Sequence, residues 1–382
     1  MTPKTLRPGE RRAGLPPWAR LTLTVSLLYV FLVAIKLMES SFKLMGGGSA
    51  GSLFEGIESP FAGLMVGVLG TVLVQSSSVT TATIVALVGS GQIGLEAAVP
   101  MIMGANIGTT VTNTLVSIGS VRRSNEFKLA FACATMHDFF NYLCVAVFLP
   151  LELATGFLSK TAVWLSGMLT SSGTQGASFK SPIKSAVKAG SKQVQGLLES
   201  TGLEDKALAV TLLLLAIGLI FLCLHNITKQ MKLLLAARIE AGLNAALARS
   251  GLVGVAVGMV VTVAVQSSSI TTSLLVPLCA AGILTLDNAL PVTLGANIGT
   301  TVTALLASLA AESTAGLSIA LVHVLFNLSG AVCFFPVPLF RRLPVLMSER
   351  LAELATRNKL WILVYVGAMF VALPLIGVFV IG

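Results

Sequence analysis

The feature that most constrains this chain is a pair of polar strings that occurs twice in an apolar sequence. The string V-Q-S-S-S-V-T-T at 74–81 returns as V-Q-S-S-S-I-T-T at 265–272, and G-A-N-I-G-T-T-V-T at 104–112 returns unchanged at 295–303. Both second copies follow the first copies by the same 191 residues. The constant spacing indicates an internal duplication, and the rest of the chain is interpreted as the frame that brings the four strings together.

The composition places the chain in a lipid bilayer. Of its 382 residues 55% are hydrophobic and 11% charged, and the mean hydropathy is +0.90. A soluble domain carries about 25% charged residues. The net charge of +9 therefore gives no indication of nucleic-acid binding. No cleavable signal peptide is predicted, because the apolar run at 21–38 is too long for a signal-peptide core. The cysteines show no metal-ligand spacing and are interpreted as small buried hydrophobes: Cys133, Cys144, Cys223, Cys279 and Cys333.

Two apolar segments, at 61–90 and 252–283, are interrupted by the serine strings. The apolar arms on either side of each string are shorter than the roughly 20 residues of a spanning helix. Each segment is therefore predicted to be a re-entrant hairpin that enters and leaves on the same side. Paired interrupted segments in corresponding halves are typical of a transporter's binding site.

The G-A-N-I-G strings lie in segments 95–118 and 286–310, which are long enough to span the bilayer. Each contains a proline and paired glycines, and both are predicted to be helices broken near the midplane. Helices at 127–150 and 317–340 complete the two copies. The predicted fold is an all-α polytopic membrane protein with two repeats, at 21–150 and 207–340. The other parts are a cytoplasmic segment at 1–20, an interfacial segment and external loop at 151–206, and a basic loop with a C-terminal helix at 341–382.

Each repeat crosses the membrane three times, so the second copy is predicted to have inverted topology. The distribution of basic residues favours the same arrangement, because cytoplasmic loops are enriched in Lys and Arg. With the N-terminus inside, the loop near Glu312 falls outside and the basic loops fall inside: Arg122, Arg123, Lys128, Lys229, Lys232, Arg238, Arg249, Arg341, Arg342, Arg350, Arg357 and Lys359. Exceptions are Lys36 and Lys43, and an external lysine series spaced by four: Lys180, Lys184, Lys188 and Lys192.

The repeated strings supply ligands for ions of both signs. Unsatisfied polar groups in hydrocarbon cost several kcal/mol each, so amides and hydroxyls clustered at a hairpin tip need partners. Oxygens of Gln, Ser, Thr and Asn suit a hard monovalent cation, and helix N-termini suit an anion. The strings contain neither Lys nor Arg. An anion would thus lack a buried cationic side chain, and bound cations could supply the missing charge.

The helix at 127–150 carries a carboxylate that the duplication does not repeat. His137 and Asn141 have counterparts in His323 and Asn327, and such pairs more often join helices than bind ligands. Asp138, in contrast, aligns with Val324. A carboxylate in an apolar span is costly and marks a functional site. Asp138 is therefore predicted to bind a cation. Nucleophile–base pairs, Walker-type loops and metal-ligand clusters are not evident, so the chain is not predicted to be an enzyme.

The doubled Q-S-S-S and G-A-N-I-G-T-T strings, with T-M-H-D-F-F-N at 135–141, resemble the type II sodium–phosphate cotransporters. The resemblance implies a sodium-driven importer of inorganic phosphate, working by alternating access, with Na⁺ as the coupled ion. It implies phosphate ligands in the serine strings and sodium ligands among the second-repeat residues, and an Asp at position 138 implies an additional sodium site and electrogenic transport. Compared with animal members, the short cysteine-free loop at 170–206 suits a compact bacterial form in an inner membrane.

The candidate site residues combine the resemblance with its repeat-related positions. Candidate phosphate ligands are Ser76, Ser77, Ser78, Ser267, Ser268, Ser269, Asn106 and Asn297. Candidate sodium ligands are Gln75, Thr109, Thr112, Asp138, Asn141, Gln266, Ser267, Thr300 and Thr303. Supporting positions are His137, His323 and Asn327. Two alternatives stay open: a sodium-coupled symporter for another small oxyanion such as sulfate or a dicarboxylate, and, from a different class, a passive anion channel.

Overall fold

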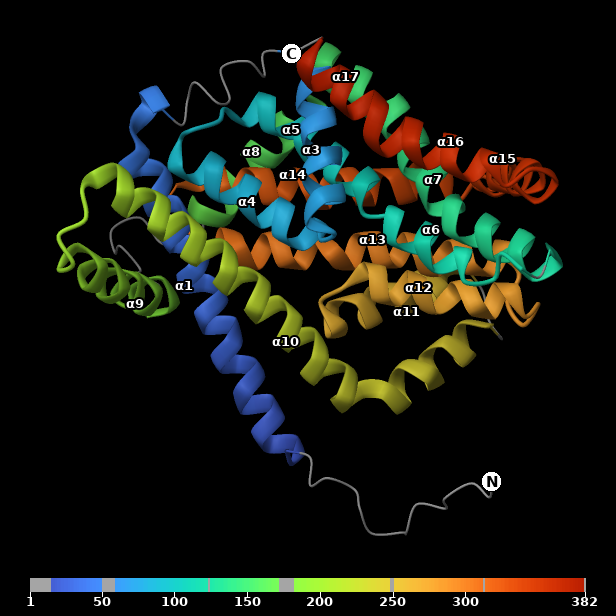
Figure 1. Ribbon diagram of the computed structural model, residues 1–382, viewed down its shortest axis with the longest axis horizontal. Coiled ribbons are helices and arrows are strands. Elements are labelled where there is room, and N and C mark those ends of the chain that lie inside the picture. The colour runs from blue at the N-terminus through green and yellow to red at the C-terminus, as the bar shows by residue number, and fades with distance from the viewer. Residues whose placement is uncertain are drawn as a thin grey trace.

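The computed structural model describes residues 15–49, 59–122, 124–171, 182–247, 251–311 and 313–380, and the elements in these ranges are helices (Figure 1). Six helices in these ranges are long and apolar enough to cross a membrane: 17–45, 124–155, 205–231, 286–308, 314–334 and 360–379. An all-α polytopic membrane protein is thus confirmed. Several predicted features lie outside the described ranges, including most of the cytoplasmic N-terminal segment, Arg123, Lys180, Arg249 and Glu312.

Both hairpin segments fold as pairs of short helices joined at the polar string. In the first repeat α3 (Pro60–Val74) is followed by α4 (Ser77–Ser90), and in the second α11 (Gly251–Val265) is followed by α12 (Ser268–Ala280). The helices end and restart at the same place in both copies, at the Q-S-S-S string. The interruption predicted from polarity is confirmed, whereas the re-entrant path through the bilayer stays a prediction.

The two G-A-N-I-G segments differ, and one prediction is wrong. The first is broken as expected, with α5 (Leu95–Gly108) ending before α6 (Val111–Ile118). The second, α13 (Leu286–Ser308), runs without a break through Gly295 and Gly299. The cost of glycine in a helix interior, roughly 0.5–1 kcal/mol, is small enough for packing to override.

The glycines of this string serve close helix packing in both copies. A Cβ on Gly104 would overlap the carbonyl oxygen of Leu64 in α3, and one on Gly295 would overlap the carbonyl oxygen of Val255 in α11. The hairpins contribute reciprocal contacts, since a Cβ on Gly67 or Gly258 would overlap the facing helix backbone. Small residues allow this approach of helix backbones in membranes. Each hairpin is therefore locked against its own G-A-N-I-G helix.

The last helix of each repeat packs against helices from the other half of the chain. The third helix of the first repeat, α7 (Ser124–Thr155), contacts α12 and α15 (Pro338–Arg357), both later in the chain. Its counterpart α14 (Thr314–Phe334) contacts α4 and α8 (Phe157–Ser171). Alongside them the first helix α1 (Pro17–Ser49) packs on the long α10 (Asp205–Leu247). The repeats are thus intertwined, with each copy covering the other.

Two connecting segments contain more helix than predicted. The prediction of a basic loop after residue 340 is wrong, because Pro338–Arg357 form the helix α15. One face of α15, with Val345, Ala352 and Ala355, is buried. Segment 151–206 contains α8 and α9 (Pro182–Glu199). On α9, Lys184, Lys188 and Lys192, three of the lysines spaced by four, are exposed. Amphipathic spacing, which places the buried positions on one side, explains both helices.

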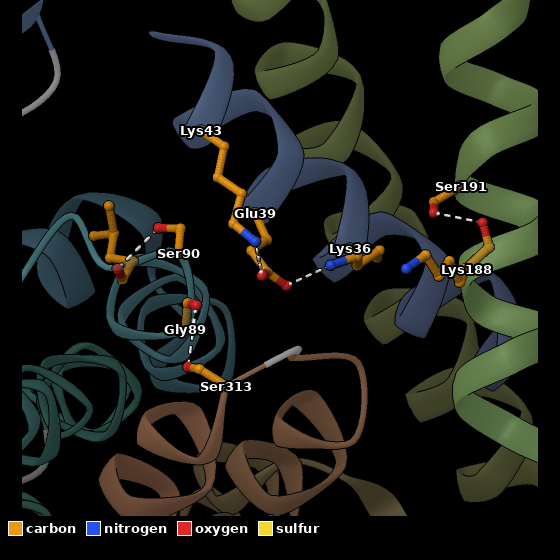
Figure 2. A network of polar contacts seen from close by, with 9 residues as sticks. Lys36, Glu39, Lys43, Gly89, Ser90, Lys188, Ser191 and Ser313 are labelled. Carbon is orange, nitrogen blue, oxygen red and sulfur yellow. Dashed lines mark hydrogen bonds and ion pairs between the residues drawn. The ribbon is translucent and has the colours of Figure 1, made fainter. Parts of the chain in front are cut away.

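Lys36 and Lys43, the exceptions in the charge distribution, lie beside a buried carboxylate in α1 (Figure 2). The Nζ of Lys36 is 3.0 Å from Glu39 Oε2, and the Nζ of Lys43 is 2.9 Å from Glu39 Oε1. Glu39 is fully buried. Buried charges are tolerated when they are paired, so this ion-pair cluster explains how a spanning helix carries two lysines.

Candidate functional site

The two hairpin tips share an unusual backbone conformation. Gln75 has φ 55° and Gln266 has φ 56°, and within the described ranges they are the non-glycine residues with positive φ. Each side-chain amide nitrogen donates back to the preceding helix, from Gln75 to Val72 O at 2.5 Å and from Gln266 to Val263 O at 2.7 Å. Strained backbone of this kind costs roughly 1–3 kcal/mol and clusters at functional sites. The same strain at both duplicated positions indicates that the tip geometry matters.

Beyond each glutamine a serine begins the second helix of the hairpin. Ser76 is the N-cap of α4 and its hydroxyl accepts from the Val79 amide at 3.4 Å; Ser267 is the N-cap of α12 and accepts from the Ile270 amide at 3.4 Å. The first N–H groups of an α-helix have no partner within the helix, and they carry the positive end of its dipole. Both tips therefore present a helix N-terminus, the kind of backbone group that suits an anion.

The two tips meet in one cavity of about 630 Å³. The prediction that the serine strings come together is thus confirmed by the geometry. One wall comes from the tip of the first hairpin, one from the tip of the second and the third from α10. The lining residues are Val74, Gln75, Ser76, Ser77, Ser78, Val79, Phe221, Leu224, His225, Thr228, Lys229, Leu233, Gln266, Ser267, Ser268, Ser269 and Ile270.

The α10 wall was missed by sequence reasoning. It brings His225, Thr228 and Lys229 to the cavity. Lys229 is exposed, so the expectation that an anion would lack a buried cationic side chain is not contradicted, but the cavity lining does include a lysine. Lys229 was assigned only as a charge of a cytoplasmic loop. The available signal was helical spacing, since Phe221, His225 and Lys229 recur every four residues and hence share one face.

The predicted cation ligands form equivalent pairs at the two tips. Thr112 donates to Gln75 Oε1 at 3.3 Å, and Thr303 donates to Gln266 Oε1 at 3.1 Å, with the same sequence separation of 37. The repeats also touch here, because the Ser78 hydroxyl donates to Thr303 Oγ1 at 3.5 Å. The fold thus places side-chain oxygens from both copies together beneath the serine strings.

Other predicted ligands lie deeper or bond to their own helices. Thr109 donates to Ala105 O and Thr300 to Ala296 O, both at 2.9 Å, and both residues are buried. They remain close in sequence to the Gln–Thr pairs but do not line the cavity. Their hydroxyl oxygens keep lone pairs after this donation, so a role as cation ligands stays a prediction.

His137 and the asparagines form a buried network between the repeats. His137 Nε2 lies 2.6 Å from Asn297 Oδ1, Asn297 donates to Asn141 Oδ1 at 2.8 Å, and Asn141 donates to Asn106 O at 2.9 Å. The structure therefore places Asn106 and Asn297 away from the cavity wall, although both were predicted as phosphate ligands. The equivalent residues of the second repeat do not reproduce the network, since Asn327 donates to the His323 carbonyl at 3.0 Å.

Asp138 is enclosed beside this network rather than in the cavity wall. Its side chain is fully buried, and its Oδ2 accepts a hydrogen bond of 2.5 Å from the Tyr365 hydroxyl. Tyr365 belongs to α16 (Leu360–Gly367), in the last helical stretch of the chain. Sequence reasoning missed this partner, because one tyrosine in an apolar helix carries no pattern.

Comparison with known proteins matches residues 30–162 and 219–377 to one family model, described as Na+/Pi-cotransporter. The sheep (Ovis aries) sodium-dependent phosphate transport protein 2A is 33% identical over 435 aligned residues, which cover 95% of this chain and 68% of the relative. The human (Homo sapiens) sodium-dependent phosphate transport protein 2B is 33% identical over 444, covering 93% and 64%. The chain thus spans about two thirds of the length of these relatives. No solved structure was found to match.

Proposed function

The chain belongs to the Na+/Pi-cotransporter family, and on this premise we propose that it imports inorganic phosphate in symport with sodium, by alternating access, in a cell inner membrane. The observation that carries the proposal is the convergence of both Q-S-S-S tips on one cavity. Sequence duplication, strained tip backbone and helix termini all coincide there. The bound species are transported substrates, so no catalytic step is invoked.

Phosphate is proposed to lie between the two serine strings. Two helix N-termini face this space, and their free N–H groups suit the oxygens of an anion. The hydroxyls of Ser76 to Ser78 and Ser267 to Ser269 add donors, and Lys229 adds positive charge to the opposite wall. An oxyanion with several acceptor oxygens matches this set of donors better than a halide, which has a single centre.

Sodium is proposed to lie at the Gln–Thr pairs, with a further ion at Asp138 and Asn141. The Oε1 and Oγ1 atoms of Gln266 and Thr303 are 3.1 Å apart. Hard cations hold oxygens at about 2.3–2.6 Å, so two oxygens at this separation can share one ion once the hydroxyl proton turns away. Bound sodium then lies next to the serine strings and offsets the charge of phosphate.

The function is tested by uptake of radiolabelled phosphate into proteoliposomes. An inward sodium gradient is expected to drive accumulation above equilibrium, and an equal potassium gradient is not. Excess unlabelled sulfate or succinate is expected to leave uptake unchanged, while unlabelled phosphate abolishes it. Competition by sulfate or succinate would favour a symporter for another oxyanion, and uptake indifferent to the sodium gradient would favour a passive channel.

The two repeats are proposed to have inverted topology, with hairpins that enter from opposite sides. The proposal is supported by the three crossings that the sequence predicts for each repeat and by the charge distribution. The pairing of α7 with α12 and of α14 with α4 fits the same two-fold relation. On this topology Lys229 lies toward the cytoplasm, and the cavity opens inward.

Opposite hairpin entry predicts opposite labelling of single cysteines in a cysteine-free background. Ser90→Cys should react with an impermeant thiol reagent from outside, and Ile283→Cys only from inside. Ile283 is used because its neighbour Gly282 has φ +69°, which a side chain would strain. Lys128→Cys serves as the cytoplasmic reference. Labelling of Ser90→Cys and Ile283→Cys from one face would refute the inverted arrangement.

A further inference from the structure

The carboxylate of Asp138 is held by a residue that belongs to neither repeat. The Tyr365 hydroxyl donates to Asp138 Oδ2 at 2.5 Å across 227 residues of sequence. Asp138 is fully buried and Tyr365 is 9% exposed, so water does not compete for this contact. Hydrogen bonds to an ionised acceptor are shorter and about twice as strong as neutral ones.

The position of the Tyr365 ring is fixed by its surroundings. Three phenylalanine rings lie against it, with centroids at 6.5, 6.2 and 6.0 Å: Phe131, Phe139 and Phe370. At the start of the same helical stretch, Lys359 Nζ lies 3.7 Å from the centroid of the Phe127 ring in α7. These contacts hold the last helix in register with α7, the helix that carries Asp138. The ring contacts thus keep the Tyr365 hydroxyl beside the Asp138 carboxylate.

The hydroxyls of Thr110 and Tyr142 lie near the same carboxylate. Asp138 Oδ1 and the Tyr142 hydroxyl are both buried and have no hydrogen-bond partner in the described part of the chain. The Thr110 hydroxyl lies close to the carboxylate, but its proton goes to Ile107 O at 2.8 Å. Buried polar atoms almost always have partners. Hydroxyl oxygens keep lone pairs for a cation, and an ion at Oδ1 would supply the partner that this buried oxygen lacks.

The last helix also contacts the first hairpin. After Tyr365 the chain makes a π-helical turn at Ala368–Ala372 and continues as α17 (Leu373–Phe379), which packs on α3. Gly377 lies directly against Met65, and a Cβ there would overlap that side chain. π-helical turns occur frequently at functional sites. One helix thus contacts both the Asp138 carboxylate and the hairpin whose tip lines the cavity.

We infer that Tyr365 is a positioning residue for the sodium site at Asp138: by holding Oδ2 it directs Oδ1 toward the ion. This inference rests on the proposed function. The hydroxyl acts through the carboxylate, so its removal leaves the cation ligand present but free to rotate. The consequence is a weaker sodium site without loss of the phosphate cavity, which contains neither residue.

The test uses the full-length protein and one conservative variant, Tyr365→Phe, with Tyr29→Phe as the matched control. Tyr29 is another membrane-helix tyrosine, whose hydroxyl donates to Ala186 O at 3.1 Å. Two quantities are measured: the sodium concentration that half-saturates phosphate uptake, and the rise in melting temperature that sodium causes in detergent. Tyr365→Phe is expected to raise the first about tenfold, as loss of one charge-assisted hydrogen bond implies, and to reduce the second. Tyr29→Phe should match wild type.

A double-mutant cycle separates positioning from a structural role. In an Asp138→Gly background, Tyr365→Phe is expected to change the sodium dependence no further. An equal effect in both backgrounds, a tighter sodium response in Tyr365→Phe, or a response identical to Tyr29→Phe would overturn the inference. Failure of the proposed function is distinguishable, because wild-type protein would then show no sodium-dependent uptake at all.

Discussion

Replacing Gln266 with alanine is expected to raise the sodium concentration needed for half-maximal phosphate uptake by about ten- to a hundredfold. Gln266 Oε1 and Thr303 Oγ1 form one side of the proposed cation site, and truncation removes the amide oxygen outright. A hydrogen bond to a charged group is worth roughly 1.5–3 kcal/mol, and each 1.4 kcal/mol is a factor of about ten. Phosphate affinity at saturating sodium should change far less, because the serines and helix termini remain.

The measurement is sodium-dependent uptake in proteoliposomes, normalised to the protein reconstituted. Gln230→Ala is the matched control: it also removes a buried amide, the one that accepts from Arg20 at 3.3 Å, but outside the cavity. The control should retain wild-type sodium dependence. A Gln266→Ala protein whose maximal rate falls while its sodium dependence stays at the wild-type value would assign Gln266 a structural role.

The hairpins were predictable because their signal is local. An apolar run too short to span, then Q-S-S-S, then another short run leaves few alternatives, and both copies fold as helix pairs that change direction at Gln75 and Gln266. The left-handed backbone at the two glutamines was not predictable. Glutamine has no intrinsic preference for positive φ, so tertiary contacts impose it.

The glycine strings show where sequence is ambiguous. A glycine pair can end a helix or let another backbone approach, and only the facing helix decides between the two. In α5 the break and the close contact at Gly104 occur together, whereas α13 keeps the contact at Gly295 and has no break. Because the strings are identical, the difference must come from residues outside them, such as Asn113, which the second copy replaces with Ala304, or from the facing helices.

The contributions of Lys229 and Tyr365 depend on long-range contacts. Lys229 is one charge among many in a basic region, and Tyr365 is one ring in an apolar helix. No sequence spacing connects Lys229 with the hairpin tips or Tyr365 with Asp138. Their roles follow from α10 closing the cavity and from the last helix lying against α7. The duplicated motifs predicted where the site is built, but not which helices outside those motifs complete it.

Asp138 marks the main asymmetry between the repeats, and from it we expect electrogenic transport. Its counterpart Val324 cannot bind a cation, so only the first repeat can hold an ion there. An unpaired carboxylate in the membrane interior is strongly penalised. The hydrogen bond from Tyr365 satisfies one oxygen and leaves Oδ1 for sodium. If this ion moves with phosphate, each cycle carries one additional positive charge inward. The second repeat has no carboxylate at this position and contributes no equivalent ion.

Asp138→Gly is therefore expected to abolish or strongly reduce the transport current while sodium-driven phosphate uptake continues. The substitution removes both the charge and the ligand, and the Gln–Thr pairs and serine strings should stay intact because Asp138 does not line the cavity. The charge moved per phosphate is measured by combining voltage clamp with tracer uptake. Asp287→Asn, which removes an exposed carboxylate in the first turn of α13, should keep the wild-type ratio. An unchanged ratio in Asp138→Gly would refute a sodium ion at this carboxylate, since loss of a coupled cation must alter the charge balance of the cycle.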